Sequence, residues 1–389
     1  MIALKNGRIV TPDRVIEDKV LCIKDDKIEA IRDSVPIGAE VVDAGGQYIM
    51  PGFIDIHSDK IEQLIQPRPT SQMDFELSLK ECERELLNLG ITTMYHSLSL
   101  YQNDFFGQSP IRTKESVLKM AKLIAEVHTK NHLIRHRLHL RIEIDFLEAF
   151  DIAKTLIEQG MVHEISFMDH TPGQGQYRNL EIYEKAISNY SGAEFKTGGI
   201  NGVMTYHQEK ETLTFSQLQE LTEFAHAHHV AVASHDDDTV EKLQLNNDLG
   251  VDISEFPITI DVAKAAHDMG LLTVIGAPNI LLGGSHSGNM SAADAISAGC
   301  GDILCSDYYP PAILHSIFVM HKTHGTPLCD MVNRCALNPA KAMKIDDAFG
   351  SLEAGKKADV LIVDLLDGYP VITHVFVDGR PTSAVAYRK

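Results

Sequence analysis

The sequence predicts a parallel (β/α)8 barrel that carries a small β-sandwich domain, and three features of the 389-residue chain support this fold class. Eight apolar runs of strand length alternate with stretches of helical periodicity over the middle of the chain. Several of the helical stretches end in glycine, which is common at helix C-termini. Both chain ends carry short runs in which β-branched residues alternate with polar ones. We therefore expect a catalytic barrel over residues 51–345 and a composite β-sandwich domain from residues 1–50 and 346–389.

The β-sandwich domain is expected to combine strands from both ends of the chain. Its strand candidates cover residues 2–10, 18–31, 40–50, 357–365 and 371–382. The pairs Asn6–Gly7 and Asp378–Gly379 stand where a tight hairpin would need positive φ. The sequence therefore predicts hairpin turns at both pairs.

The barrel is expected to use eight parallel strands with helices between them. The strand candidates cover residues 48–57, 91–99, 138–144, 162–170, 230–236, 252–258, 271–278 and 302–309. The clearest helical stretches cover residues 78–90, 115–128, 215–229 and 261–270. In this fold the residues that do chemistry lie at the C-terminal ends of the strands. The polar residues that close the strands are therefore the first candidates for a site.

Charge and cysteine content limit the possible functions. With 35 basic and 54 acidic residues the formal net charge is −19, which disfavours binding to nucleic acid or to an anionic membrane. The six cysteines form no Cys-x-x-Cys pair, and no apolar run approaches the ~18 to 20 residues that cross a bilayer. We therefore expect a cytoplasmic enzyme with a small-molecule substrate, and base rates for oligomers favour a homodimer.

Five of the eight predicted strands end in His, Asp or Glu, which indicates a metal site. Residues two apart in a strand face the same way, so His57 and Asp59 can bind one ion, and His139, Arg141 and Glu143 share a face. A single histidine at a strand end is more often structural, but coincidence at five strand ends is much rarer. Mixed nitrogen and oxygen donors suit one or two ions of Zn²⁺, Mn²⁺ or Fe²⁺ and are poor for Ca²⁺. The candidate ligands are His57, Asp59, Glu143, His170, His235 and Asp307.

The order of these strand-end motifs resembles the amidohydrolase superfamily. Longer motifs resemble, more narrowly, its branch in phosphonate metabolism, which serves the carbon–phosphorus lyase pathway. The motifs are IMPGFIDIHSD (49–59), GITT (90–93), MDHTPGQGQ (168–176), SHDDDT (234–239), SEFPIT (254–259), GAPNILLGGSHSGN (276–289) and SDYYP (306–310). The resemblance covers the whole predicted barrel and implies a metal-dependent hydrolase.

The first-strand motif departs from the pattern of most of the superfamily. Most members have His-x-His there, whereas this chain has His57-x-Asp59, in which it resembles the phosphonate branch. An anionic ligand in place of an imidazole adds negative charge at the metals and disfavours soft metals. The stretch is therefore expected to be a metal site in which a carboxylate replaces one imidazole.

The single histidines of the superfamily usually come from the fifth and sixth strands. In this chain His170 and His235 close the predicted fourth and fifth strands. Either a strand lies undetected between Glu143 and His170, or another residue takes the place of His170. The substitutes to consider are the Tyr95–His96 pair and His286.

The phosphonate branch implies hydrolysis of α-D-ribose 1-methylphosphonate 5-triphosphate to the 5-phosphate and pyrophosphate. The phosphoanhydride would be broken by metal-bound hydroxide, because a metal ion lowers the pKa of bound water from 15.7 to roughly 7. Asp307 would take the proton from this water and later offer it to the leaving group. The resemblance therefore makes Asp307 both a ligand and the catalytic acid–base residue.

So anionic a substrate requires local cations and free backbone N–H groups in a chain of net charge −19. Glycines let backbone amides approach phosphate oxygens, and barrels commonly bind phosphate in the loops after strands seven and eight. The candidate substrate-binding residues are Lys60, Arg68, Arg178, Gly283, Gly284, Ser285 and His286.

Two other functions compete with the diphosphatase. Another amidohydrolase, acting on a cyclic amide or an N-acyl C–N bond, would use the same metal ligands but would not need the anion-binding set. A non-catalytic scaffold on the same fold would have lost its metal ligands, whereas the candidate ligands are all present in this sequence.

Overall fold

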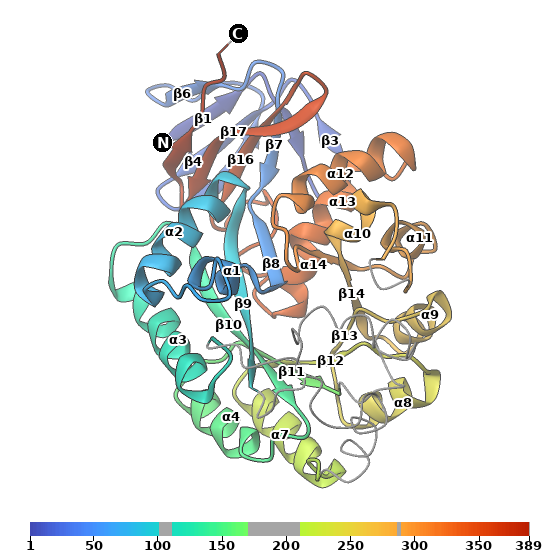
Figure 1. Cartoon of the computed structure of the whole chain (residues 1–389). Helices are drawn as coiled ribbons and strands as arrows, with labels where there is room; N and C mark the ends of the chain where they lie inside the picture. Colours follow the sequence, from blue (N-terminus) through green and yellow to red (C-terminus); the bar gives the residue numbers. More distant parts are fainter. Residues whose placement is uncertain (101–110, 170–210, 286–288, 389) are drawn as a thin grey trace.

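The computed structural model describes residues 1–100, 111–169, 211–285 and 289–388. Its central feature is an eight-stranded parallel sheet in the order β15-β14-β13-β12-β11-β10-β9-β8, rolled into a barrel with helices around it (Figure 1). Each strand overlaps a predicted strand segment, so the (β/α)8 fold class is confirmed. The barrel strands are β8 (Phe53–Ser58), β9 (Ile91–Leu100), β10 (Arg135–Glu143), β11 (Glu164–Met168), β12 (Ala231–His235), β13 (Ile253–Glu255), β14 (Leu272–Gly276) and β15 (Ile303–Cys305).

The barrel closes between its first and last strands at Ser58 and Asp307, which form an isolated parallel bridge. The N–H of Asp307 donates to the His57 carbonyl at 3.0 Å, and the N–H of Asp59 donates to the Asp307 carbonyl at 3.1 Å. The Ser58 hydroxyl donates to the same carbonyl at 2.7 Å. Closure of the barrel therefore holds the backbones of three predicted site residues against one another.

Helices surround the barrel, and their ends follow the local sequence. Side chains cap the N-termini of α2, α3, α7, α8 and α9 by accepting a backbone N–H, as Thr214 does from Gln217. Gly90 after α2 has φ +84°, and a Cβ there would come within 2.6 Å of Ile372 Cδ1, so only glycine fits. The helices are α1 (Lys60–Ile65), α2 (Phe75–Asn88), α3 (Lys114–Glu126), η1 (Val127–Thr129, 3₁₀), α4 (Ala149–Glu158), α7 (Phe215–Ala227), α8 (Val240–Asp248), α9 (Ile260–Asp268), α10 (Ala277–Leu282), α11 (Ala292–Ser297), α12 (Ala312–Thr323), α13 (Leu328–Cys335) and α14 (Leu337–Ala342).

Two further sheets lie at one end of the barrel, beside α2 and α12, and both chain termini lie there (Figure 1). The four-stranded sheet, in the order β5-β4-β1-β6, comes from the N-terminal part alone. The six-stranded sheet, in the order β18-β17-β16-β7-β2-β3, combines strands from both chain ends, as the sequence predicts. The strands are β1 (Ile2–Lys5), β2 (Arg8–Val10), β3 (Val15–Ile16), β4 (Val20–Lys24), β5 (Lys27–Arg32), β6 (Glu40–Asp43), β7 (Tyr48–Pro51), β16 (Val360–Leu366), β17 (Tyr369–Val377) and β18 (Arg380–Ala384).

One of the two predicted hairpins forms and the other does not. Asp378 and Gly379, with φ 47° and 71°, join the antiparallel pair β17–β18. The Asn6–Gly7 prediction is wrong, because β1 pairs with β4 and β6 whereas β2 pairs with β3 and β7. The chain passes between two sheets here, and a Cβ at Gly7 would lie 2.5 Å from Ile49 Cδ1. A close approach therefore requires this glycine.

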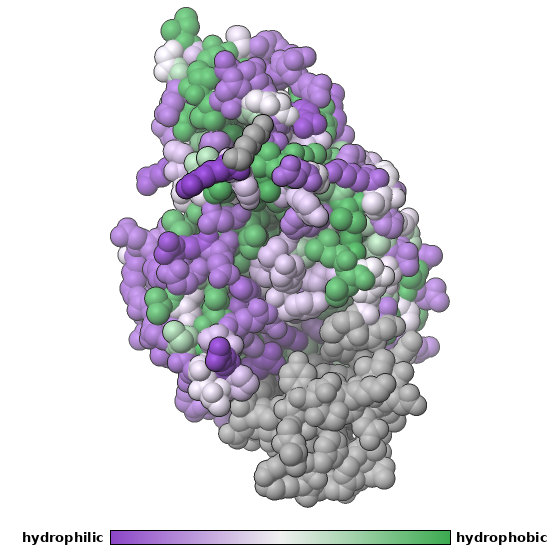
Figure 2. Space-filling model, turned by 45° about the horizontal axis from the view of Figure 1, so that its top comes forward, coloured by the Kyte–Doolittle hydropathy of each residue, from purple (hydrophilic) through white to green (hydrophobic). Residues whose placement is uncertain are grey.

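Buried apolar residues precede the polar side chains at the C-terminal ends of the barrel strands. Ala231 and Ala233 precede His235 on one face of β12, and Ile253 precedes Glu255 on β13; all are buried. Small or apolar side chains therefore fill the interior along these strands, and the polar residue comes last in each strand. On the outside, hydrophilic residues predominate on the coloured part of the face drawn in Figure 2, with hydrophobic groups between them. Among the described helices, none has the length and apolar character to cross a membrane.

Candidate metal centre

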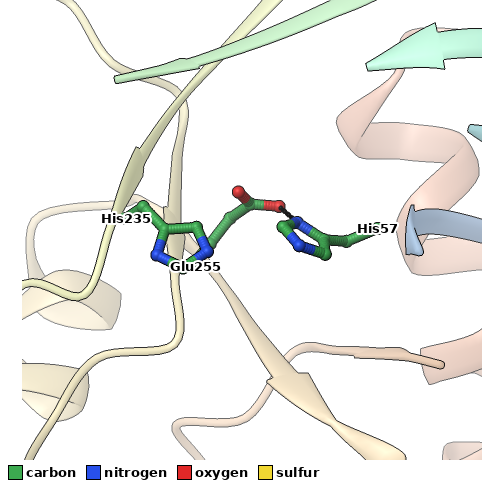
Figure 3. A group of neighbouring side chains, drawn as sticks. All are labelled: His57, His235 and Glu255. Carbon is green, nitrogen blue, oxygen red and sulfur yellow. Dashed lines mark hydrogen bonds and ion pairs between the residues drawn. The ribbon is translucent and has the colours of Figure 1, made fainter. Parts of the chain in front are cut away.

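Three buried side chains converge at the C-terminal ends of separate barrel strands: His57 of β8, His235 of β12 and Glu255 of β13 (Figure 3). Their potential ligand atoms all lie within 4.8 Å of one another. Glu255 Oε1 lies 2.8 Å from His57 Nδ1, and the centroids of the two imidazole rings are 5.4 Å apart. In Figure 3 the carboxylate of Glu255 lies between the two rings. Two imidazoles and a carboxylate at this spacing can bind one divalent ion.

Left-handed backbone conformations end the strands that carry the site. Asp236 directly after β12, Phe256 directly after β13 and Asp307 just beyond β15 have φ 54°, 52° and 54°. Non-glycine residues seldom adopt this conformation, and such strain collects at functional sites. The turns make His235 and Glu255 the last residues of their strands, so both side chains stay at the mouth of the barrel.

The two imidazoles of the centre are prepared to act as ligands. Burial, followed by the charge of Arg141, holds the pKa of His57 well below its usual value, so the ring is neutral. Nδ1 of His235 lies 2.8 Å from Oδ2 of Asp236, the distance of an ion pair. Its Nε2 is buried and has no hydrogen-bond partner within the described chain. A neutral imidazole with a free ring nitrogen is the form that binds a metal ion.

Burial is the main influence on the carboxylates around this group. Burial raises the pKa of Glu255 and of Asp59, and burial together with the nearby Asp59 raises the pKa of Asp307 to about 7. Oδ1 of Asp59 and Oε2 of Glu255 are buried without a hydrogen-bond partner among the described residues. A buried acceptor without a donor is costly, and a divalent cation would satisfy several at once. The residues present therefore fit a divalent metal ion.

A second group, formed by His139, Glu164 and Glu255, shares Glu255 with the first. His139 donates from Nδ1 to the Ile56 carbonyl at 3.1 Å, and its Nε2 lies 3.8 Å from Glu255 Oε2. Glu164 is fully buried, and neither of its carboxylate oxygens has a hydrogen-bond partner in the described part of the chain. Because Glu255 belongs to both groups, the described residues could hold one divalent ion or two.

The structure brings part of the predicted ligand set together. His57 and His235 lie in the same group, and Asp59 and Asp307 are joined to it through the barrel closure. Glu143 is buried at the end of β10 but belongs to neither group, while His170 lies outside the described residues. The roles of all six predicted ligands remain predictions, including those of His57 and His235, which the structure brings into one group.

The strand order bears on the positions of the single histidines, which the superfamily usually has on the fifth and sixth strands. Between Glu143 and Met168 the described chain contains α4 and β11 and no further strand, so His235 does lie on the fifth barrel strand. The sixth strand, β13, ends in Glu255, a carboxylate where the family resemblance implies a histidine. His96, a candidate substitute for His170, has its Nε2 2.8 Å from His136 Nδ1, and Nε2 of His136 in turn lies 3.3 Å from Glu83 of α2.

Glu255 is a candidate ligand of both groups that is absent from the set predicted from the sequence. The sequence predicts a strand over residues 252–258, which places Glu255 in the interior of the strand rather than at its end. The strand ends at Glu255 because Phe256 turns the backbone to positive φ. Proline at 257 is the local signal that could have shortened the strand, since proline breaks ladder hydrogen bonds.

Most of the predicted substrate-binding residues are engaged elsewhere or exposed. Lys60 forms an ion pair with Glu85 of α2 at 3.0 Å, and Arg68 is exposed in the loop after α1. The N–H groups of Gly283 and Gly284 donate to carbonyls of α10, so they end this helix. Ser285 follows in the same loop, whereas Arg178 and His286 lie outside the described residues. Their role in phosphate binding remains a prediction.

Comparison with known proteins gives a match over nearly the whole chain. The profile of the Amidohydrolase family matches residues 48–385. The chain is 30% identical over 399 residues to the alpha-D-ribose 1-methylphosphonate 5-triphosphate diphosphatase of Escherichia coli K12, which covers 97% of this chain and 99% of that protein. A dihydroorotase of Listeria welshimeri is 41% identical over 58 residues, 15% of this chain and 14% of that protein.

Solved structures show the same fold. The N-acetylglucosamine-6-phosphate deacetylase of Pasteurella multocida superposes with a TM-score of 0.67 at 15% identity, over 99% of this chain and 100% of that chain. The family profile spans the barrel strands that carry the two His/Glu groups and the closing Asp307. With its barrel, its site at the strand ends and this match, the chain belongs to the amidohydrolase family and is a hydrolase of that superfamily.

Proposed function

We propose that this protein is a divalent-metal-dependent diphosphatase of the phosphonate (carbon–phosphorus lyase) pathway. Its substrate would be α-D-ribose 1-methylphosphonate 5-triphosphate, and its products the 5-phosphate and pyrophosphate. The observation that carries the proposal is the 30% identity to the Escherichia coli diphosphatase over almost the full length of both chains. The buried metal centre supports it, because hydrolysis of a phosphoanhydride needs an activated water and a positive charge at the phosphoryl oxygens.

The chain's own residues would divide the chemistry between them. His57, His235 and Glu255 would hold a divalent ion, which lowers the pKa of water from 15.7 to roughly 7 and polarises a phosphoryl oxygen. Asp307 would accept the proton of the attacking water and return it to the leaving pyrophosphate. Its backbone hydrogen bonds to His57 and Asp59 hold the backbone of Asp307 next to these two residues, which supports this role.

The proposal is tested by phosphorus NMR of the products formed from the 5-triphosphate by metal-replete protein. We expect one pyrophosphate and one 5-phosphate per turnover, and no reaction after removal of the metal with a chelator. Release of orthophosphate would show that the terminal phosphorus is attacked instead. Absence of any phosphorus product, with metal confirmed by elemental analysis, would overturn the proposal.

A second candidate is a hydrolase of cyclic amides, which the partial match to dihydroorotase favours. That match covers only 15% of this chain, so it carries less weight than the full-length match. The same protein sample should be assayed with dihydroorotate. Turnover of dihydroorotate together with inertness toward the 5-triphosphate would reverse the order of the two candidates.

Replacing Arg68 with alanine is expected to raise KM for the triphosphate by several-fold to about tenfold, since a charge-assisted hydrogen bond to phosphate is lost. Arg68 is exposed, so folding and metal content should not change. Steady-state kinetics on the triphosphate and on a neutral cyclic amide provide the measurement. An equal effect on both substrates would exclude a phosphate-binding role for Arg68.

A further inference from the structure

Arg141 places a positive charge inside the barrel mouth. It lies on β10 two residues after His139, whose ring contacts the His57 ring at 5.0 Å, and residues two apart share a strand face. Burial raises the pKa of Asp59, Glu255 and Asp307, and the charge of Arg141 counteracts this at all three. The guanidinium is therefore close to side chains from several barrel strands around the metal centre.

The guanidinium of Arg141 has no anionic partner in the described chain. Its Nε is buried without a hydrogen-bond partner, and its Nη2 reaches only the Met168 sulfur, at 3.8 Å. Two other partly buried arginines show the usual arrangement: Arg112 donates from Nε to both oxygens of Glu62, and Arg135 pairs with Asp359. Buried donors without acceptors are costly, so the position of Arg141 is explained best by an acceptor that arrives with a ligand.

The chemistry of this acceptor follows from the guanidinium and its surroundings. Arginine presents paired N–H donors whose geometry matches two oxygens of a phosphate, phosphonate or carboxylate group. The protein as a whole carries a formal net charge of −19, so a substrate oxyanion needs a local positive charge to enter this mouth. Lys60 does not supply it, because it is paired with Glu85.

We propose that Arg141 forms an oxyanion subsite beside the metal centre, in which its N–H groups bind the non-bridging oxygens of a phosphoryl group of the substrate. The choice of a phosphoryl group over a carboxylate rests on the proposed function. Arg141 is thereby a substrate-binding residue, and it sets the preference of the site for anionic substrates. Within the described ranges its guanidinium has no carboxylate partner, which leaves its N–H groups available to the ligand.

The subsite is tested by equilibrium dialysis of radiolabelled inorganic phosphate against the full-length, metal-loaded protein. Phosphate is the probe because pyrophosphate and triphosphate chelate metal ions. Loss of one charge-assisted pair should weaken phosphate binding by roughly 10- to 100-fold in Arg141→Gln. Arg141→Lys, which keeps the charge but loses the paired donors, should weaken it less. Arg84→Gln is the matched control, since Arg84 is 67% exposed and paired with Glu81 of its own helix, and it should bind phosphate normally.

Elemental analysis of the same samples separates anion binding from a structural role. We expect the same metal content per chain in the wild type and in the Arg141 variants. Phosphate binding by Arg141→Gln equal to that of the wild type, or lost only together with the metal, would overturn the subsite, as would failure of the wild-type protein to bind phosphate. If Arg141→Gln does not fold, Arg141→Lys decides: weaker binding supports the subsite, and unchanged binding overturns it.

The dialysis needs no turnover, so its failure is distinct from failure of the proposed function. Phosphate binding that depends on Arg141, without pyrophosphate release from the triphosphate, would keep the subsite and remove the diphosphatase. Pyrophosphate release with unaltered phosphate binding by Arg141→Gln would do the opposite.

Discussion

Replacing Asp307 with asparagine is expected to lower turnover by about 10²- to 10⁴-fold, the range typical of a general acid–base group. The amide cannot accept the proton of the attacking water. The backbone should tolerate the change, because asparagine adopts the left-handed conformation that Asp307 has (φ 54°) more readily than most residues. The backbone bonds that close the barrel between Asp307 and His57 should therefore remain.

Turnover of Asp307→Asn is measured by phosphorus NMR on protein of known metal content. We expect the metal content to stay close to that of the wild type, so that the loss is assigned to proton transfer. The pKa of Asp307 is raised to about 7 without a metal ion, chiefly by burial, and a bound cation would lower it by favouring the charged form. Near-normal turnover would remove Asp307 as the proton carrier.

Replacing Glu255 with glutamine is expected to abolish stable metal binding, with a loss of affinity of at least about 100-fold, and to abolish turnover with it. Glu255 is the one residue common to both His/Glu groups of the described chain. Glutamine keeps the size of the side chain and can still accept a hydrogen bond from His57, so the barrel should fold. Only the negative charge that a cation requires is removed.

Metal content after dialysis and the change in Tm on adding Zn²⁺ or Mn²⁺ measure this effect. Glu62→Gln is the matched control, because Glu62 is also a mostly buried carboxylate but accepts from Arg112 at 2.8 Å instead of facing a metal group. We expect the control to keep its metal. A Glu255→Gln variant that holds as much metal as the wild type would show that the ion is bound by other residues.

The barrel fold could be predicted from the sequence because the patterns that indicate its strands and helices are local. Runs of apolar residues must be buried on parallel strands, and the helices between them begin at capping residues such as Thr214 and Thr239. The Asn6–Gly7 hairpin failed for the opposite reason. A turn sequence reports local backbone geometry, but strand partners are chosen by packing against residues far away, such as Ile49.

The candidate site could be predicted only in part, because some of its residues are defined by contacts between distant parts of the chain. His57 and His235 could be named because each closes an apolar strand. Glu255 was harder to name, because the end of β13 depends on the positive φ of Phe256, and Pro257 is the local sequence signal of that end. The role inferred for Arg141 was also hidden: spacing places it on the face of His139, but spacing does not tell whether an arginine has a carboxylate partner.

The sequence by itself determined the (β/α)8 class, the strand ends that carry His57, His235 and Asp307, and the resemblance to the amidohydrolase superfamily, because these depend on residue type and short spacing. Only the tertiary structure decided that Glu255 joins His57 and His235, and that Arg141 has no carboxylate partner among the described residues. Both depend on distances across a closed barrel, which are set when the Ser58–Asp307 bridge joins its first and last strands.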